Sequence, residues 1–157
     1  MRALYAAPVE RALRKELDHL DRHCRRFIAY SPFVVLATAD ADGRQDATPR
    51  GGDPGFVHVA DDHTLLLPDR PGNNRLDSLA NLTQWPEVGL LFMVPGVDET
   101  LRVNGTAELR DDPDLTGRFA ASGRSPRIVV QITVRQAYLH CAKALMRSRL
   151  WDPDVQI

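Results

Sequence analysis

Cysteines and long apolar runs are scarce in this chain of 157 residues. Its two cysteines, Cys24 and Cys141, form no CxxC pattern, which favours free thiols in a reducing compartment; a single disulfide between them is the alternative. No apolar segment reaches the length of a membrane span, and the first residues lack a signal-peptide core. We therefore expect a cytoplasmic protein with no membrane partner.

Charge of one sign is also lacking, because 20 basic and 21 acidic side chains leave a formal net charge of −1. No overall electrostatic field attracts nucleic acid, so we expect no nucleic-acid partner. The remaining composition, 43% hydrophobic and 26% charged, is that of an ordinary globular protein. The length suits one domain that covers residues 1–157.

Short apolar or alternating runs separated by turn residues predict strands at residues 33–39, 44–48, 56–59, 64–67, 87–94, 100–109 and 128–134. The last of these can continue through residues 138–140. The run at 87–94 is continuously apolar, which predicts a strand buried on both faces, and Gly105 marks an expected bulge. Strands joined by hairpins, with helices at the periphery, favour a small antiparallel barrel over a βαβ sheet.

Periodicity and capping signals predict helices at residues 8–29, 73–85, 112–121 and 141–151. On the first of them His19 and His23 lie one turn apart, but no carboxylate lies between them as in a HExxH zinc motif. A solvated face is therefore favoured, and we predict no metal site. The second helix is expected to bury Leu76, Leu79 and Leu82 on one face.

Residues 65–79 form the stretch most informative for function. An apolar strand leads into a loop, and Asn73 or Asn74 is suited to cap the helix that follows. Free N–H groups at a helix start, with Arg70 and Arg75 beside them, make an anion site, because the guanidinium fork pairs well with phosphate. The alternative is a capped helix with two solvated arginines. The stretch is neither a Walker loop nor a three-glycine dinucleotide motif.

Five segments stand out together: residues 31–38 (SPFVVLAT), 46–51 (DATPRG), 68–75 (PDRPGNNR), 95–105 (PGVDETLRVNG) and 140–145 (HCAKAL) with 147–151 (RSRLW). In this order they resemble the pyridoxamine 5'-phosphate oxidase-like flavoproteins, in an FMN-dependent branch. The resemblance runs from about residue 17 to residue 153. It implies a β-dominated fold, a six- to eight-stranded antiparallel split barrel of Greek-key type with peripheral helices.

The resemblance further implies a homodimer with one FMN in each of two clefts between subunits. The residues at the positions that bind the phosphate are Arg70, Asn73, Asn74 and Arg75. The flavin ring would lie along a strand at Asp46, Ala47, Thr48, Pro49 and Arg50. Arg50 would then reach the N1–O2 side of the ring, where a cation stabilises negative charge.

The partner subunit's contribution to each cleft would come from the C-terminal basic segment, residues 142–157, through Lys143, Arg147, Arg149 and Trp151. For the basic residues a solvated helix face is the alternative, and for Trp151 it is core or dimer packing. Cys141 is expected to be a small buried hydrophobe rather than a nucleophile.

The resemblance implies an FMN-dependent oxidoreductase that exchanges electrons between a nicotinamide or other donor and a small organic molecule. Asn74-Arg75 replaces the Arg-Lys pair of the vitamin oxidase and the C-terminal tail differs, which argues against pyridoxamine phosphate as substrate. His58, Tyr138 and His140 are possible general acids, so the catalytic residue stays unassigned. The alternatives are a flavin-storing dimer without turnover, or a related barrel that uses deazaflavin or haem, with His140 as the axial ligand to test.

Overall fold

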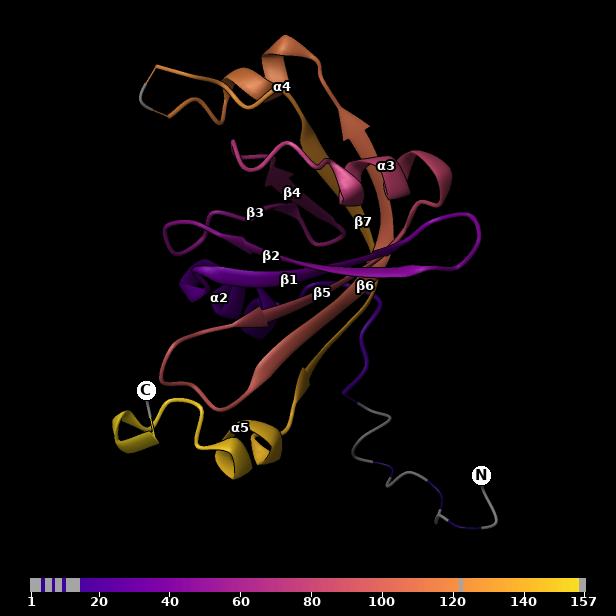
Figure 1. Cartoon of the computed structure of the whole chain (residues 1–157). Helices are drawn as coiled ribbons and strands as arrows, with labels where there is room; N and C mark the ends of the chain where they lie inside the picture. The colour runs from indigo at the N-terminus through magenta and orange to yellow at the C-terminus, as the bar shows by residue number, and fades with distance from the viewer. Residues whose placement is uncertain (1–3, 5–6, 8–9, 11–14, 122, 156–157) are drawn as a thin grey trace.

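The computed structural model of the chain describes residues 4, 7, 10, 15–121 and 123–155, and within them seven strands form one antiparallel sheet (Figure 1). The strand order is β2-β1-β5-β6-β7-β4-β3. The bounds are β1 Phe33–Ala39, β2 Gln45–Gly51, β3 His58–Asp61, β4 Thr64–Pro68, β5 Glu87–Met93, β6 Thr100–Arg110 and β7 Val129–His140. The β-dominated antiparallel split barrel expected from the sequence is confirmed.

Both predicted hairpins form, β1 with β2 and β3 with β4. The expected bulge is also present, because the pairing of β6 with β7 shifts register between Asn104 and Gly105. A Cβ built on Gly105 would lie only 2.1 Å from the carbonyl oxygen of Thr133, so glycine is required for this close approach. The last strand does continue to His140, as one strand of 12 residues.

The prediction that residues 87–94 are buried on both faces is wrong. In β5, Val88, Leu90 and Phe92 are buried, whereas Gly89 and Leu91 on the opposite face are only partly buried. The strand is central, but the core covers one of its faces. A strand that is apolar on both faces gives the same continuous pattern whether other parts of the protein cover both faces or only one. Hydrophobic periodicity therefore cannot distinguish the two cases.

The helices are α2 Arg22–Tyr30, α3 Asp77–Gln84, α4 Pro113–Gly117 and α5 Lys143–Ser148, with a 3-10 turn at Pro153–Val155. Asp112 caps α4 as its sequence indicates, through a hydrogen bond of 3.3 Å from the amide of Leu115. The predicted extension of α4 to residue 121 is wrong, and α5 ends before Arg149, whose left-handed backbone (φ 51°) stops the helix.

The predicted helix at residues 8–29 is interrupted in the structure: Glu10 is helical, residues 15–21 are not, and α2 begins at Arg22. Asp21 caps α2 by accepting hydrogen bonds from the amides of His23 and Cys24, and Leu17 instead pairs with Ala137 of β7. His19 therefore precedes the helix, so the two histidines do not share a helical face. Residues 8, 9 and 11–14 of the prediction lie outside the described residues.

The core lies between α2 and one face of the sheet. Leu20, Cys24 and Ile28 pack there against Val34, Leu36, Leu90, Phe92, Leu101 and Val103. Both cysteines are free; Cys24 is buried, and Cys141 is exposed, contrary to the expectation that it is buried. None of the helices in the described residues is long and apolar enough to cross a membrane.

Candidate functional site

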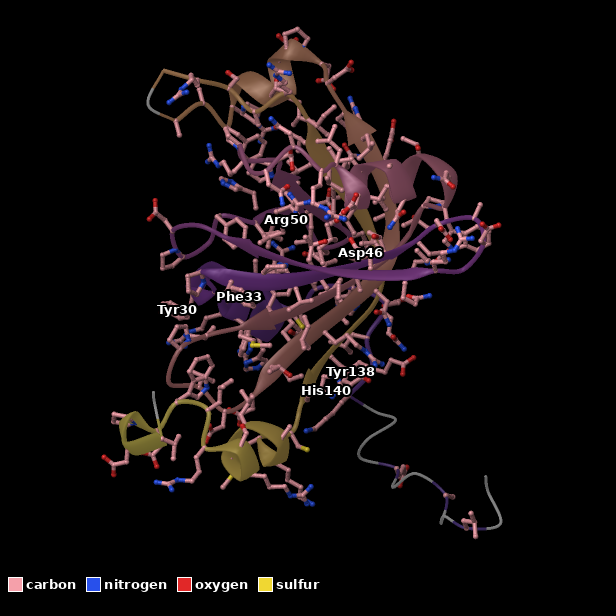
Figure 2. The ribbon with its side chains drawn as sticks, in the orientation of Figure 1. Tyr30, Phe33, Asp46, Arg50, Tyr138 and His140 are labelled. Carbon is pink, nitrogen blue, oxygen red and sulfur yellow. The ribbon has the colours of Figure 1, made fainter. Side chains whose placement is uncertain are left out.

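Three of the predicted site residues alternate along β2, and their side chains share one face of the sheet. Cross-strand register places Asp46, Thr48 and Arg50 opposite Thr38, Leu36 and Val34, which point toward the core. Because β2 is an edge strand, no strand continues the sheet beyond it; α3 packs against this end of the core face, and Asp69, just after β4, pairs with Arg50. Asp46 and Arg50 follow one another along β2 in Figure 2.

Hydrogen bonds tie β2 to α3 at this point. The hydroxyls of Thr48 and Ser78 lie 2.5 Å apart, and both bond the same Oδ2 of Asp46, at 3.0 Å and 3.2 Å. One turn later, the side-chain amide of Asn81 donates to Thr38 at 3.0 Å. The carboxylate of Asp46 is thus occupied in positioning α3. Sequence reasoning missed Ser78, whose only signal was a small polar residue on an otherwise apolar helix face.

Arg50 forms an ion pair with Asp69, at 2.7 Å between Nη1 and Oδ1. Both side chains are largely covered, with exposed fractions of 22% and 21%. The Nε of Arg50 is buried and donates to no acceptor in the described part of the chain. One donor of this guanidinium is therefore left for a group that the chain itself does not supply.

Ala47 and Pro49 lie on the opposite face of β2 and are exposed. Register places them beside Ala37 and Val35 of β1. Pro49 has no N–H to donate, so its nitrogen must face the free edge of the sheet and not β1. The five predicted residues on β2 therefore divide between the core face and the open face.

The loop before α3 differs from its prediction, because neither Asn73 nor Asn74 caps the helix. Leu76 occupies the cap position in a left-handed conformation (φ 60°), and no side chain bonds the first-turn N–H groups. The side chain of Asn73 instead accepts from the amide of Arg75 at 3.1 Å, a local turn that competes with capping. Leu76 is also 55% exposed rather than buried.

The uncapped helix start leaves backbone donors next to Arg75, and Arg70 lies earlier in the same loop. Arg75 is exposed, and its Nε bonds Asp77 at 2.7 Å; that hydrogen bond raises the pKa of the guanidinium. Arg70 donates one N–H to the carbonyl of Phe119 at 3.3 Å, which leaves its other donors for a ligand. Free N–H groups, the positive helix end and guanidinium groups fit a phosphate.

His58 lies on β3 near this loop and is exposed, as expected for a sheet-surface residue. Its ring packs edge-on against Phe119 with centroids 4.7 Å apart. Partial burial, together with the positive charges of Arg118 and Arg70, lowers its pKa. His58 is therefore mainly neutral at pH 7, and its surroundings are basic.

The C-terminal candidates lie elsewhere. Lys143, Arg147 and Arg149 are exposed, and Arg149 pairs with Asp152. The indole of Trp151 is half-buried and donates to the carbonyl of Val97 at 2.9 Å, which fixes it to the loop between β5 and β6. In Figure 1 this segment lies at the end of β7 remote from α4, apart from α3. The structure thus brings the β2 and loop residues together and leaves the C-terminal ones separate.

Two pockets in the described structure lie away from these residues. One of about 240 Å³ lies at α4, beside Arg110, and one of about 260 Å³ lies between α2 and the residues at Lys15 and Tyr138. Neither is lined by a predicted cofactor residue. No cluster of three or more potential metal ligands occurs among the described residues.

The sequence profile described as pyridoxamine 5'-phosphate oxidase matches residues 20–141. The chain belongs to the pyridoxamine 5'-phosphate oxidase family. The resemblance stated from its motifs is thereby confirmed. Members of the pyridoxamine 5'-phosphate oxidase family generally bind a flavin and are typically dimers. No match was found among proteins of curated function.

Solved structures support this family fold. A candidate pyridoxamine 5'-phosphate oxidase from Lactobacillus delbrueckii is 25% identical, with a TM-score of 0.60 over 79% of this chain and 98% of that one. HupZ of Group A Streptococcus is 18% identical, with a TM-score of 0.61 over 76% and 92%. Rv2991 of Mycobacterium tuberculosis is 19% identical, with a TM-score of 0.58 over 82% and 90%. The last two show the fold alone.

Proposed function

We propose that this protein binds FMN and is an FMN-dependent oxidoreductase acting on a small organic molecule. The observation that carries the proposal is the uncapped start of α3 beside Arg75, with Arg70 earlier in the same loop, in a chain whose family generally binds a flavin. The phosphate of FMN would accept hydrogen bonds from the first-turn N–H groups and from these arginines. Asn73 and Asn74 would shape the loop around it.

The flavin ring would lie along the backbone of β2, from Asp46 to Arg50. As an edge strand, β2 has backbone groups on its outer side that are free to bond the pyrimidine edge of the ring. Arg50 would place its charge near N1 and O2, and its buried Nε has a donor to spare. Once bound, FMN supplies hydride or electron transfer; Arg50 stabilises negative charge on the ring, and Asp69 holds Arg50 in place.

The proposed site needs a second copy of the chain. Lys143, Arg147, Arg149 and Trp151 lie apart from α3 within one chain, so only another subunit can bring them to the same cofactor. The open sheet face suits that contact, because Val35, Ala37, Gly89 and Leu91 form a small-residue apolar surface across β1 and β5. We infer a homodimer that joins through this face.

No proton donor is assigned to the reaction. Burial, together with nearby arginine charge, lowers the pKa of both His58 and His140, so both are mainly neutral at pH 7 and poor general acids. We expect the substrate or a bound water to carry the proton. A reduced nicotinamide is the donor to test first.

The test is the visible absorption spectrum of the purified protein, followed by anaerobic addition of NADH or NADPH. We expect a yellow protein whose flavin bands bleach with one of the two donors. Cofactor released by heat and identified by mass spectrometry distinguishes FMN from deazaflavin, and a Soret band would indicate haem. A flavin that no donor or organic substrate reduces would favour a storage role. A colourless protein that also fails to take up added FMN would overturn the proposal.

A further inference from the structure

Arg102 is a partly buried arginine that pairs with no acidic side chain among the residues that the structure describes. It lies in β6 between Leu91 of β5 and Tyr138 of β7, on the open face of the sheet. Its Nε is buried and bonds no acceptor, and its guanidinium forms no ion pair within the described residues. By contrast, seven other arginines pair with acidic side chains: Arg25, Arg44, Arg50, Arg75, Arg110, Arg135 and Arg149.

The ring of Tyr138 supports Arg102 but does not satisfy it. The Cζ of Arg102 lies 4.4 Å from the ring centroid, a cation–π contact. The ring attracts the positive charge, but it does not supply an oxygen acceptor for the buried Nε–H. Burying such a donor without an acceptor is costly, so this arrangement is suited to a ligand that brings the acceptors.

The neighbouring side chains offer no negative charge. The side-chain amide of Asn104 donates to the oxygen of Gln136 at 2.6 Å, and both side chains are uncharged. The ring of His140 packs on Tyr138 with centroids 4.6 Å apart, and its pKa is lowered by burial and by the charge of Arg102. Figure 2 shows Tyr138 and His140 together, at a distance from Asp46 and Arg50. The group is therefore separate from the proposed phosphate site.

We propose that Arg102, supported by Tyr138, binds the carboxylate of a small organic acid. The planar fork of the guanidinium matches the two oxygens of a carboxylate. A monoanion is favoured over a phosphate, because one arginine supplies one charge and its neighbours Asn104, Gln136, Tyr138 and His140 add none. The proposal does not depend on which cofactor the chain binds.

The test is an NMR titration of the arginine Nε–Hε signals with acetate, benzoate and inorganic phosphate as probes. We expect a saturable shift of the Arg102 signal with the carboxylates and a much weaker response to phosphate. Arg102→Met should abolish carboxylate binding, and Arg102→Lys, which keeps the charge but not the fork, should weaken it at least tenfold. Arg135→Met is the matched control, because its guanidinium already pairs with Glu87, and it should bind carboxylates as the unmodified protein does.

Two outcomes would overturn the proposal. The first is an Arg102 signal that no carboxylate moves, and the second is a stronger response to phosphate than to carboxylates. If the signal does not move and both Arg102 variants also lose the dimer, the acceptor is a carboxylate of a second copy. If Arg102→Met does not fold, the comparison of Arg102→Lys with the control still decides the question.

Discussion

Arg50 and Arg102 share a feature that none of the other arginines in the described residues shows, a buried Nε with no acceptor. Arg50 is nevertheless held by Asp69, whereas Arg102 is held only by an aromatic face. Arg75 is the opposite case, exposed and paired with the acid two residues along. Arg75 would bind a phosphate because the contact with Asp77 fixes its orientation at the start of α3, and not because it is buried.

Replacing Arg75 tests the phosphate assignment directly. Arg75→Ala should weaken FMN binding by roughly tenfold or more, because a charge-assisted hydrogen bond to phosphate is lost. Isothermal titration of the apoprotein with FMN measures this. Arg44→Ala is the matched control, since Arg44 is also exposed and paired with nearby acids, but at the hairpin turn. Equal affinities of the two variants would remove Arg75 from the site.

The two cysteines should differ sharply in reactivity. Burial raises the pKa of the Cys24 thiol to about 12, so at pH 8 almost none of it is thiolate, whereas Cys141 is exposed. A thiol reagent such as DTNB should modify one group quickly and the second only after unfolding. Cys141→Ser should remove the fast phase. Two fast thiols in the native protein would contradict the buried position of Cys24.

At the scale of elements, strands were more predictable than helix ends. The alternation of Leu101 and Val103 with Arg102 and Asn104 identified β6 and its inward face, and the turn at Gly43 identified the first hairpin. The start of α3 was missed because an asparagine before a helix can bond either the helix or its own turn, and Asn73 bonds its turn. Sequence periodicity cannot distinguish these choices.

The candidate site residues show the same limit of sequence-based prediction. The segments that contain Arg50 and Arg70 were predicted as site residues from their motifs, but the contacts of β2 with Asp69 and Ser78 depend on how β2, β4 and α3 meet. The lack of a partner for Arg102 is likewise visible only after folding. It depends on the absence of an acidic side chain from the neighbouring strands on that face, which no sequence pattern predicts.

The bulge opposite Gly105, where Arg135 is the extra residue of β7, gives an element-scale prediction. Gly105→Ala should lower the free energy of unfolding by roughly 2–3 kcal/mol, because the added Cβ would overlap the carbonyl of Thr133 in the neighbouring strand. Urea unfolding followed by circular dichroism measures the change. Gly117→Ala, where a Cβ meets nothing within 4 Å, is the control and should stay within about 1 kcal/mol. Similar losses for both would mean that the bulge tolerates a side chain.

At the scale of the whole molecule, the two faces of the sheet differ in what packs against them. One face holds the core under α2, and the other combines an apolar half on β1 and β5 with a polar half on β6 and β7. The proposed dimer would bury the apolar half and bring the C-terminal segment to the site of the other chain. The polar half, with Arg102, would then line the edge of the cleft.

A charge in the apolar half should break the proposed dimer. Ala37→Glu should shift the protein toward monomer in sedimentation velocity, because the new carboxylate would lie between Ala47 and Gly89 and be costly to bury unpaired. FMN binding should weaken with it, since the partner's residues leave the site. Ala120→Glu, an exposed position beside α4, is the control and should not alter the mass. An Ala37→Glu variant that stays dimeric would place the contact on another surface.

Pro49 has a consequence for the behaviour of the protein at high concentration. It lies in the middle of an edge strand, where exposed backbone donors otherwise invite strands of other molecules to add to the sheet. A proline removes one donor at the point where such an intruding strand would need it. The edge can therefore stay open for a ligand while resisting the strand-by-strand growth that leads to aggregates.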